Sequence, residues 1–204
     1  MERMMNVESK YSASFIAAAL LYQECLRMKE ILLSPDFEKR IGQEVEENAV
    51  LSVKTRSARK RITQEVRKRQ AVAPDGFWSF FFQQPEEAQK LALLFLCLKA
   101  YPLMMDFHIE VTLKKWRSKS LELEFFDLQM RLDEIASQDA VVADWSATTH
   151  RKTITVYLRT LSEAGLLKKG QLAKPEKIAP DFWKYFIQKG EAWFVEACFL
   201  NKNH

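Results

Sequence analysis

Two stretches of the sequence combine cations with hydroxyl-bearing residues, which are the groups that bind phosphates. Residues 54–69 (KTRSARKRITQEVRKR) carry eight Lys or Arg against one Glu, and residues 150–169 carry five against one. The whole chain of 204 residues has a formal net charge of only +4, so these stretches hold all of its positive excess. Because nucleic acids present closely spaced phosphate charges, this concentration predicts a nucleic-acid footprint.

In both stretches the cations begin at the expected start of a helix. Hydroxyls and cations at that end can bond phosphates and base edges when the helix enters a major groove. The residues predicted to contact DNA are Arg56, Ser57, Arg59, Lys60, Arg61, Arg67 and Lys68 in the first stretch, and Thr148, Thr149, Arg151, Lys152, Thr155, Arg159, Lys168 and Lys169 in the second.

The sequence gives little support for catalysis. Its three His and three Cys show neither HxxxH nor CxxC spacing, so we expect no metal site and no disulfide framework. It also lacks a Gly-rich phosphate loop and a G-x-S-x-G motif. We therefore expect a non-enzymatic, cytoplasmic protein with no catalytic residue, cofactor or small-molecule substrate, although a nuclease built from dispersed Asp and Glu stays an alternative.

The periodicity of apolar residues predicts a mainly α protein. One long helix is expected over residues 14–33, a second from Ser34-Pro35 to about Glu46, and a basic helix over about 57–70. Further helices are expected over about 85–101 and 121–136, with 125, 128 and 132 on one apolar side. Residues 106–116 fit a strand or a helix equally.

The apolar run within residues 91–107 is the only candidate for a membrane segment. Lys99 and Pro102 interrupt it, whereas a spanning helix needs roughly 20 apolar residues. We interpret it as a buried core helix and expect no contact with a membrane.

Residues 149–170 (THRKTITVYLRTLSEAGLLKKG) predict a helix that leads into a small β-hairpin. Ile154, Tyr157, Leu158 and Leu161 form its apolar stripe, and Gly165 is expected to end the helix in a left-handed conformation. The following chain predicts a two-stranded wing that turns at residues 169–170. The alternative is a solvated amphipathic helix with a glycine cap.

The basic segments also look like two copies of one unit. Residues 57–67 align without a gap with 149–159 at an offset of 92, and APDGFWSFFFQ (73–83) aligns downstream with APDFWKYFIQ (179–188). Coincidence between two amphipathic basic helices is the alternative. We expect the aromatic clusters to be packing residues rather than stacking platforms for single-stranded nucleic acid.

These observations predict two helix-turn-helix-like units, the second of them winged by the hairpin. Residues 1–84 are expected to form an N-terminal helical domain with the basic unit, and residues 85–204 a C-terminal winged-helix-like domain. The expected partner is double-stranded DNA, bound mainly through its phosphates by both basic helices. Structured RNA, or an acidic protein bound by the basic faces, stays an alternative partner.

Three segments of the chain resemble the BrxA family of bacterial BREX phage-exclusion systems. They are YSASFIAAALLYQECLRMKEILLS (11–34), RSARKRITQEVRKR (56–69) and WSATTHRKTITVYLRTLSEAGLL (145–167). The resemblance spans most of the chain, although no single motif is diagnostic. It implies a cytoplasmic, mainly helical, DNA-binding accessory protein that supports host-DNA methylation and phage restriction by larger partners. It adds other BREX components as candidate partners and supplies no catalytic residues.

Overall fold

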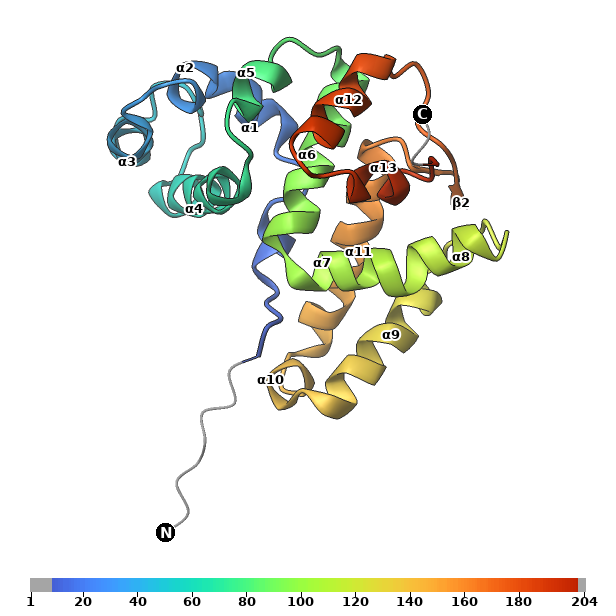
Figure 1. The fold of residues 1–204 in the computed structure, drawn as a ribbon. Helices are drawn as coiled ribbons and strands as arrows, with labels where there is room; N and C mark the ends of the chain where they lie inside the picture. The colour runs from blue at the N-terminus through green and yellow to red at the C-terminus, as the bar shows by residue number, and fades with distance from the viewer. Residues whose placement is uncertain (1–8, 202–204) are drawn as a thin grey trace.

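The computed structural model describes residues 9–201, and helices make up most of it (Figure 1), so the predicted mainly α fold is confirmed. Its first half consists of η1 (Ser14–Ala17), α1 (Tyr22–Arg27), α2 (Lys29–Leu32), α3 (Phe37–Glu47), α4 (Arg56–Val72), α5 (Phe77–Phe81) and α6 (Glu86–Ala100). Its second half consists of α7 (Pro102–Asp106), the π-helical η2 (Phe107–Thr112), α8 (Leu113–Arg117), α9 (Phe125–Gln138), α10 (Ala140–Ala143), α11 (Ala147–Glu163), β1 (Leu167–Lys168), β2 (Gln171–Leu172), α12 (Pro180–Gln188) and α13 (Trp193–Ala197).

Helix α6 lies at the centre of the described core. Every side chain from Leu91 to Leu98 is buried, which confirms the predicted core helix. The helix contacts α4 on one side and α11 on the other, and Figure 1 shows it between the α3–α4 pair and the α9–α11 pair. A helix that is apolar on all sides is stable only when it is surrounded, so both halves of the chain must cover α6.

Within residues 9–201, no single helix is long and apolar enough to cross a membrane. The segments Glu86–Ala100 and Pro102–Arg117 meet that test only together, as a pair bent by 108°.

The prediction of one long helix over residues 14–33 is wrong. The chain forms η1, unwinds, and resumes as α1 and α2. In the unwound part the carbonyls of Ala18, Ala19 and Leu20 accept hydrogen bonds from the guanidinium of Arg69, at 2.7 Å for Ala18 and 2.5 Å for Ala19. Arg69 is completely buried. Its bonds satisfy carbonyls that a continuous helix would have satisfied itself, so the helix is interrupted here.

Two other regions differ from the expected helix boundaries. Residues 106–116, for which the sequence allowed a strand or a helix, are helical and include η2 and most of α8. Helix α9 begins at Phe125 rather than at residue 121, because a capping box starts it there: the amide of Glu124 donates to the carboxylate of Asp127 at 2.8 Å. Phe125 itself is 38% exposed, so the expected apolar side of this helix is buried at Leu128 and Leu132 but not at its first residue.

The predicted hairpin is present. β1 pairs antiparallel with β2, and Lys169 and Gly170 form the turn with φ of 51° and 79°. The preceding residues 121–123 are extended alongside it, since the amide of Leu123 donates to the carbonyl of Gly170 at 2.9 Å. Gly165 has φ of 80° and ends α11 as predicted.

The two aromatic segments pack against each other, as expected for core residues. Phe80 of α5 stacks on Tyr185 of α12 with 3.7 Å between the ring centroids. Three aligned aromatic positions are buried in both segments. They are Phe77, Trp78 and Phe81 in the first, and Phe182, Trp183 and Phe186 in the second.

Replacing Arg69 with Met should lower the free energy of unfolding by roughly 3 kcal/mol, because three buried carbonyls lose charged donors. Urea unfolding measures this loss. The matched control is Arg67→Met on the same helix, whose ion pair with Glu38 is largely exposed (2.8 Å) and is worth about 1 kcal/mol or less. Equal losses in the two variants would contradict the role given to Arg69.

Candidate nucleic-acid interface

Helix α11 presents one polar side to solvent and one apolar side to the core. The hydroxyl of Ser146 caps the helix by accepting from the amide of Thr149 at 3.2 Å. Ile154, Tyr157 and Leu161 are fully buried, as predicted. The opposite side of the helix faces solvent. Its exposed residues, which we call the α11 outer face, are Thr148, Arg151, Lys152, Thr155 and Arg159.

Helix α4 repeats this arrangement. It has the same length of 17 residues, and the hydroxyl of Thr55 caps it by accepting from the amide of Ala58 at 3.2 Å. Its exposed residues have the same spacing as those of α11; they form the α4 outer face, Ser57, Lys60, Arg61, Gln64 and Lys68. The spacing i, i+3, i+4, i+7, i+11 places each set on one side of its helix.

The two outer faces correspond at an offset of 91 residues, one less than the sequence alignment gives. At 91, the buried Thr63 and Val66 fall on the buried Ile154 and Tyr157. At 92, buried Thr63 would fall on exposed Thr155. The exposed counterpart of Arg151-Lys152 is therefore Lys60-Arg61, not Arg59-Lys60.

Arg59 is turned inward because it holds the connection between α3 and α4. Its Nε donates to the carbonyl of Val45 at 2.8 Å, and one of its terminal nitrogens donates to that of Val53 at 2.9 Å. The side chain is only partly exposed. These bonds give Arg59 a structural role, and its contact with DNA stays a prediction.

Other predicted cations of the first stretch have carboxylate partners. Arg56 binds Glu46 at 2.5 Å, and this bond holds the pKa of the Glu46 carboxyl below its usual range. Arg67 binds Glu38, and Lys68 binds the buried Glu65 at 2.8 Å. Within residues 9–201, Lys60 and Arg61 have no ion pair.

Fewer of the predicted cations in the second stretch form internal ion pairs. Arg151, Lys152 and Lys169 are exposed and have no ion pair in the part of the chain that the structure describes. Arg159 binds Glu163 at 3.1 Å, with both side chains exposed. Because exposed pairs of this kind are worth less than about 1 kcal/mol, a phosphate can replace the carboxylate.

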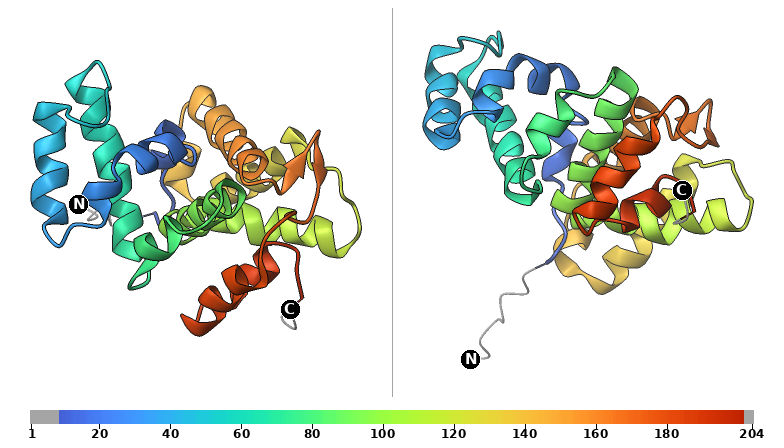
Figure 2. Two further views of the ribbon diagram at one scale, coloured as in Figure 1. Left: turned by 90° about the horizontal axis from the view of Figure 1, so that it is seen from above. Right: turned by 45° about the horizontal axis from the view of Figure 1, so that its top comes forward.

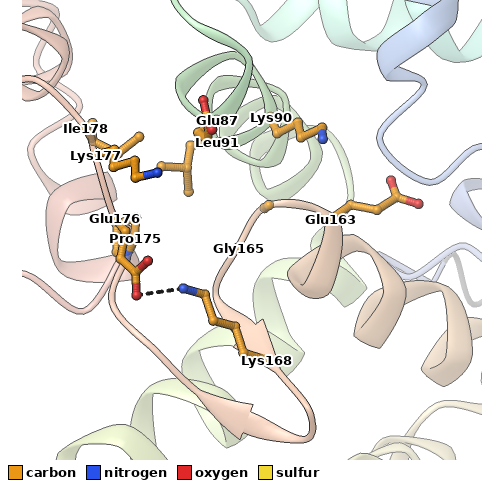
Figure 3. Close-up of a pocket in the computed structure, with 11 residues that line it drawn as sticks. Glu87, Lys90, Leu91, Glu163, Gly165, Lys168, Pro175, Glu176, Lys177 and Ile178 are labelled. Atoms are coloured by element: carbon orange, nitrogen blue, oxygen red, sulfur yellow. Dashed lines mark ion pairs between the residues drawn. The ribbon is translucent and has the colours of Figure 1, made fainter.

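Lys168 lies at a cleft of about 190 Å³ where the first turns of α6, the end of α11 and the loop after β2 meet. Figure 3 shows Lys168 directed toward Glu176, with which it forms an ion pair of 2.8 Å. Lys90 and Glu87 from α6 also line this cleft. Acidic and basic side chains are equal in number around this cleft. Lys168 is therefore held there by its ion pair with Glu176.

The basic helices are positioned by one short segment. Residues Ser14–Ala17 (η1) contact both α4 and α11. In the view from above, this dark blue segment lies between the teal α4 and the orange α11 (Figure 2). The spacing of the two outer faces thus depends on η1 together with α6, which also contacts both helices.

A buried polar network lies beneath α11, and the sequence prediction missed it. The Nε2 of His108 donates to the carbonyl of Ala197 at 2.8 Å, which leaves Nδ1 to accept from the hydroxyl of Tyr157 at 3.0 Å. That hydroxyl in turn accepts from Thr112 at 2.7 Å. The π-helical turn of η2 carries both His108 and Thr112. No spacing in the sequence indicates that a π-helical turn occurs there.

The thiols do not offer a nucleophile. Cys25, Cys97 and Cys198 are all buried. Burial raises the pKa of each thiol, to about 12 for Cys25, so the reactive thiolate form is disfavoured. Residues 9–201 also hold no group of three or more His, Cys, Asp or Glu that could bind a metal ion.

Comparison with known proteins adds a family and a fold. A family model described as BrxA matches residues 9–190. The BREX protein BrxA of Bacillus cereus (strain H3081.97) is 28% identical over 165 residues, which are 80% of this chain and 82% of that protein. The crystal structure of an uncharacterized protein from Magnetospirillum magneticum has a TM-score of 0.74 at 19% identity, covering 94% of this chain and 99% of that one. The last match shows the fold alone.

The network beneath α11 predicts how stability depends on pH. Burial lowers the pKa of His108 to about 4, below its ordinary value of 6.5, so the unfolded chain takes up this proton first as the pH falls. The contribution of neutral His108 to the free energy of unfolding is on the order of 3 kcal/mol. It is complete above about pH 6.5 and is lost as the pH falls from about 6.5 to 4. Urea unfolding across this range measures it.

A His108→Gln variant should lose this pH dependence, whereas His150→Gln should keep it. An NMR titration of the folded protein checks the assignment directly. If the His108 ring titrates near its ordinary pKa, the buried network is not intact in solution.

Proposed function

This chain belongs to the BrxA family of BREX phage-defence systems, and we propose that it acts there as a non-catalytic accessory protein that binds double-stranded DNA. The observation that carries the proposal is the repeated outer face of α4 and α11. Both faces place two adjacent cations one turn after a hydroxyl, on helices of equal length. Other components of the BREX system are its natural protein partners.

The surroundings of α11 support the role of a DNA-reading helix. Extended residues 121–123, α9, the short α10, α11 and the hairpin follow one another in the order of a winged helix. In such a domain the first turns of the last helix enter the major groove, and the hairpin lies beside the phosphate backbone. Arg151 and Lys152 would occupy the groove end, and Lys169 the tip of the wing.

Binding through phosphates fits the chemistry of both faces. Lys60, Arg61, Arg151 and Lys152 are exposed and have no ion pair within residues 9–201, so they can reach an anion without breaking internal bonds. The α4 outer face adds Ser57 and Gln64, whose polar side chains also bond phosphate oxygens. We therefore propose that both units bind the backbone of one duplex, with α11 placed to contact base edges.

Charge reversal on either face should weaken binding to double-stranded DNA at least about tenfold, because each variant removes two phosphate contacts and adds two repulsions. The variants are Lys60→Glu/Arg61→Glu and Arg151→Glu/Lys152→Glu, measured by gel shift. Arg59 is avoided because its loss would release the connection between α3 and α4.

The matched control is Lys184→Glu/Lys189→Glu, at exposed positions within α12 and directly after it. It makes the same change in net charge on another surface and should alter affinity less than about threefold. If all three variants lose affinity equally, net charge rather than the two outer faces controls binding.

Competition between matched DNA and RNA duplexes tests the form of nucleic acid. The deep, narrow major groove of A-form RNA excludes a helix such as α11, so RNA should displace labelled DNA only at about tenfold higher concentration or more. Equal competition would favour structured RNA as the ligand. Failure of both to bind at low salt would instead favour an adaptor whose basic faces bind acidic proteins.

A further inference from the structure

An apolar patch is exposed on the helix next to α11. Phe126 is 66% exposed and Met130 is 53% exposed, both on the outward side of α9. Leu121 and Phe125, just before and at the start of this helix, are also more than a third exposed. Contiguous apolar surface of this kind marks a site where another molecule binds.

Acidic residues surround the patch. Residues 121–144 carry seven Asp or Glu against the single cation Arg131. Asp133 and Glu134 follow Phe126 and Met130 on the same outward side, and all four are exposed. We call these four residues the α9 face. Its charge is opposite to that of the α11 outer face and repels phosphate, so it is unsuited to DNA.

The α9 face is a ridge between two hollows. On one side Phe125 and Gln129 form a groove with His150 and Arg151 of α11. On the other side Met130 and Glu134 form a groove with η2 and α8. In Figure 1, α9 lies at the outer edge of the described molecule, and Phe126 and Met130 on the ridge are exposed. A ridge with flanking grooves can pack against the side chains of one helix.

We propose that the α9 face docks a helix of another protein, apolar on one side and rich in Lys and Arg beside it. Phe126 and Met130 bind its apolar side, and Asp133 and Glu134 bind its cations. Glu134 pairs with Arg131 at 3.0 Å, and a cation of the docked helix replaces or shares this half-exposed pair. A second copy of this chain fits less well. Its two basic surfaces, the α4 and α11 outer faces, have cations and polar groups but no large apolar side chain. Docking on α9 leaves the α4 outer face free, and on the α11 outer face it approaches Arg151, which lines the groove beside Phe125.

A synthetic peptide of Leu and Lys, with Leu at helical spacing on one side, serves as the probe. Fluorescence anisotropy should show that Phe126→Ser/Met130→Ser weakens its binding at least about tenfold, since two exposed apolar anchors are lost. Asp133→Asn/Glu134→Gln should weaken binding about threefold and make it less sensitive to salt. Leu33→Ser, which removes another exposed apolar residue (40%), is the control and should change nothing.

Three results would overturn the proposal. The first is unchanged peptide binding by the Phe126→Ser/Met130→Ser variant. The second is equal binding of a scrambled peptide that cannot form an amphipathic helix. The third is a dimer in sedimentation experiments that this variant abolishes, since the face would then bind a second copy. The variant should keep its affinity for DNA, so failure here is distinguishable from failure of the proposed DNA binding.

Discussion

The buried guanidinium of Arg69 determines how the two halves of the chain meet. A fully buried cation is stable only when oxygen acceptors surround it, and here the carbonyls of Ala18, Ala19 and Leu20 provide them. Those carbonyls are free because the chain unwinds between η1 and α1. The unwound chain in turn lays η1 between α4 and α11, where Phe15 packs on Tyr101 with 5.7 Å between the rings. The bonds of Arg69 thus hold the segment that joins the two basic helices, and α6 supports both helices from the core.

A feature of this structure could be predicted from the sequence where the residues that cause it lie within the same segment. Helix α11 was predicted closely, because its hydroxyl cap, its apolar stripe and Gly165 lie within the segment itself. The break after η1 could not be predicted, since its cause, Arg69, lies about fifty residues further along the chain. Arg59 was predicted to contact DNA, and Arg69 was counted in the charge of the same basic stretch, because no periodicity distinguishes a buried arginine that binds carbonyls from an exposed one. The repeat between the two basic helices was found in the sequence, but the pattern of buried residues aligns α4 with α11 at an offset of 91 residues rather than 92.

The second half of the molecule separates two kinds of surface on neighbouring helices. The outer side of α11 is basic and polar, whereas that of α9 is acidic and apolar. A protein with one binding function has no need for the second surface. This separation is compatible with the family, since a BREX system has several components. In the two proposals made above, a different helix serves each partner. The shared fold of the Magnetospirillum magneticum protein offers a second chain in which to look for it.

Binding of one duplex by both basic helices has a measurable consequence in the salt dependence of the affinity. With about five phosphates bound by Lys60, Arg61, Arg151, Lys152 and Lys169, the logarithm of the affinity should fall with that of the salt concentration at a slope near −4.5. Neutralising either cation pair with Gln should lower the steepness by about two units, and neutralising both should lower it by about four. A slope that changes only when the α11 pair is neutralised would contradict the claim, because α4 would then lie outside the complex.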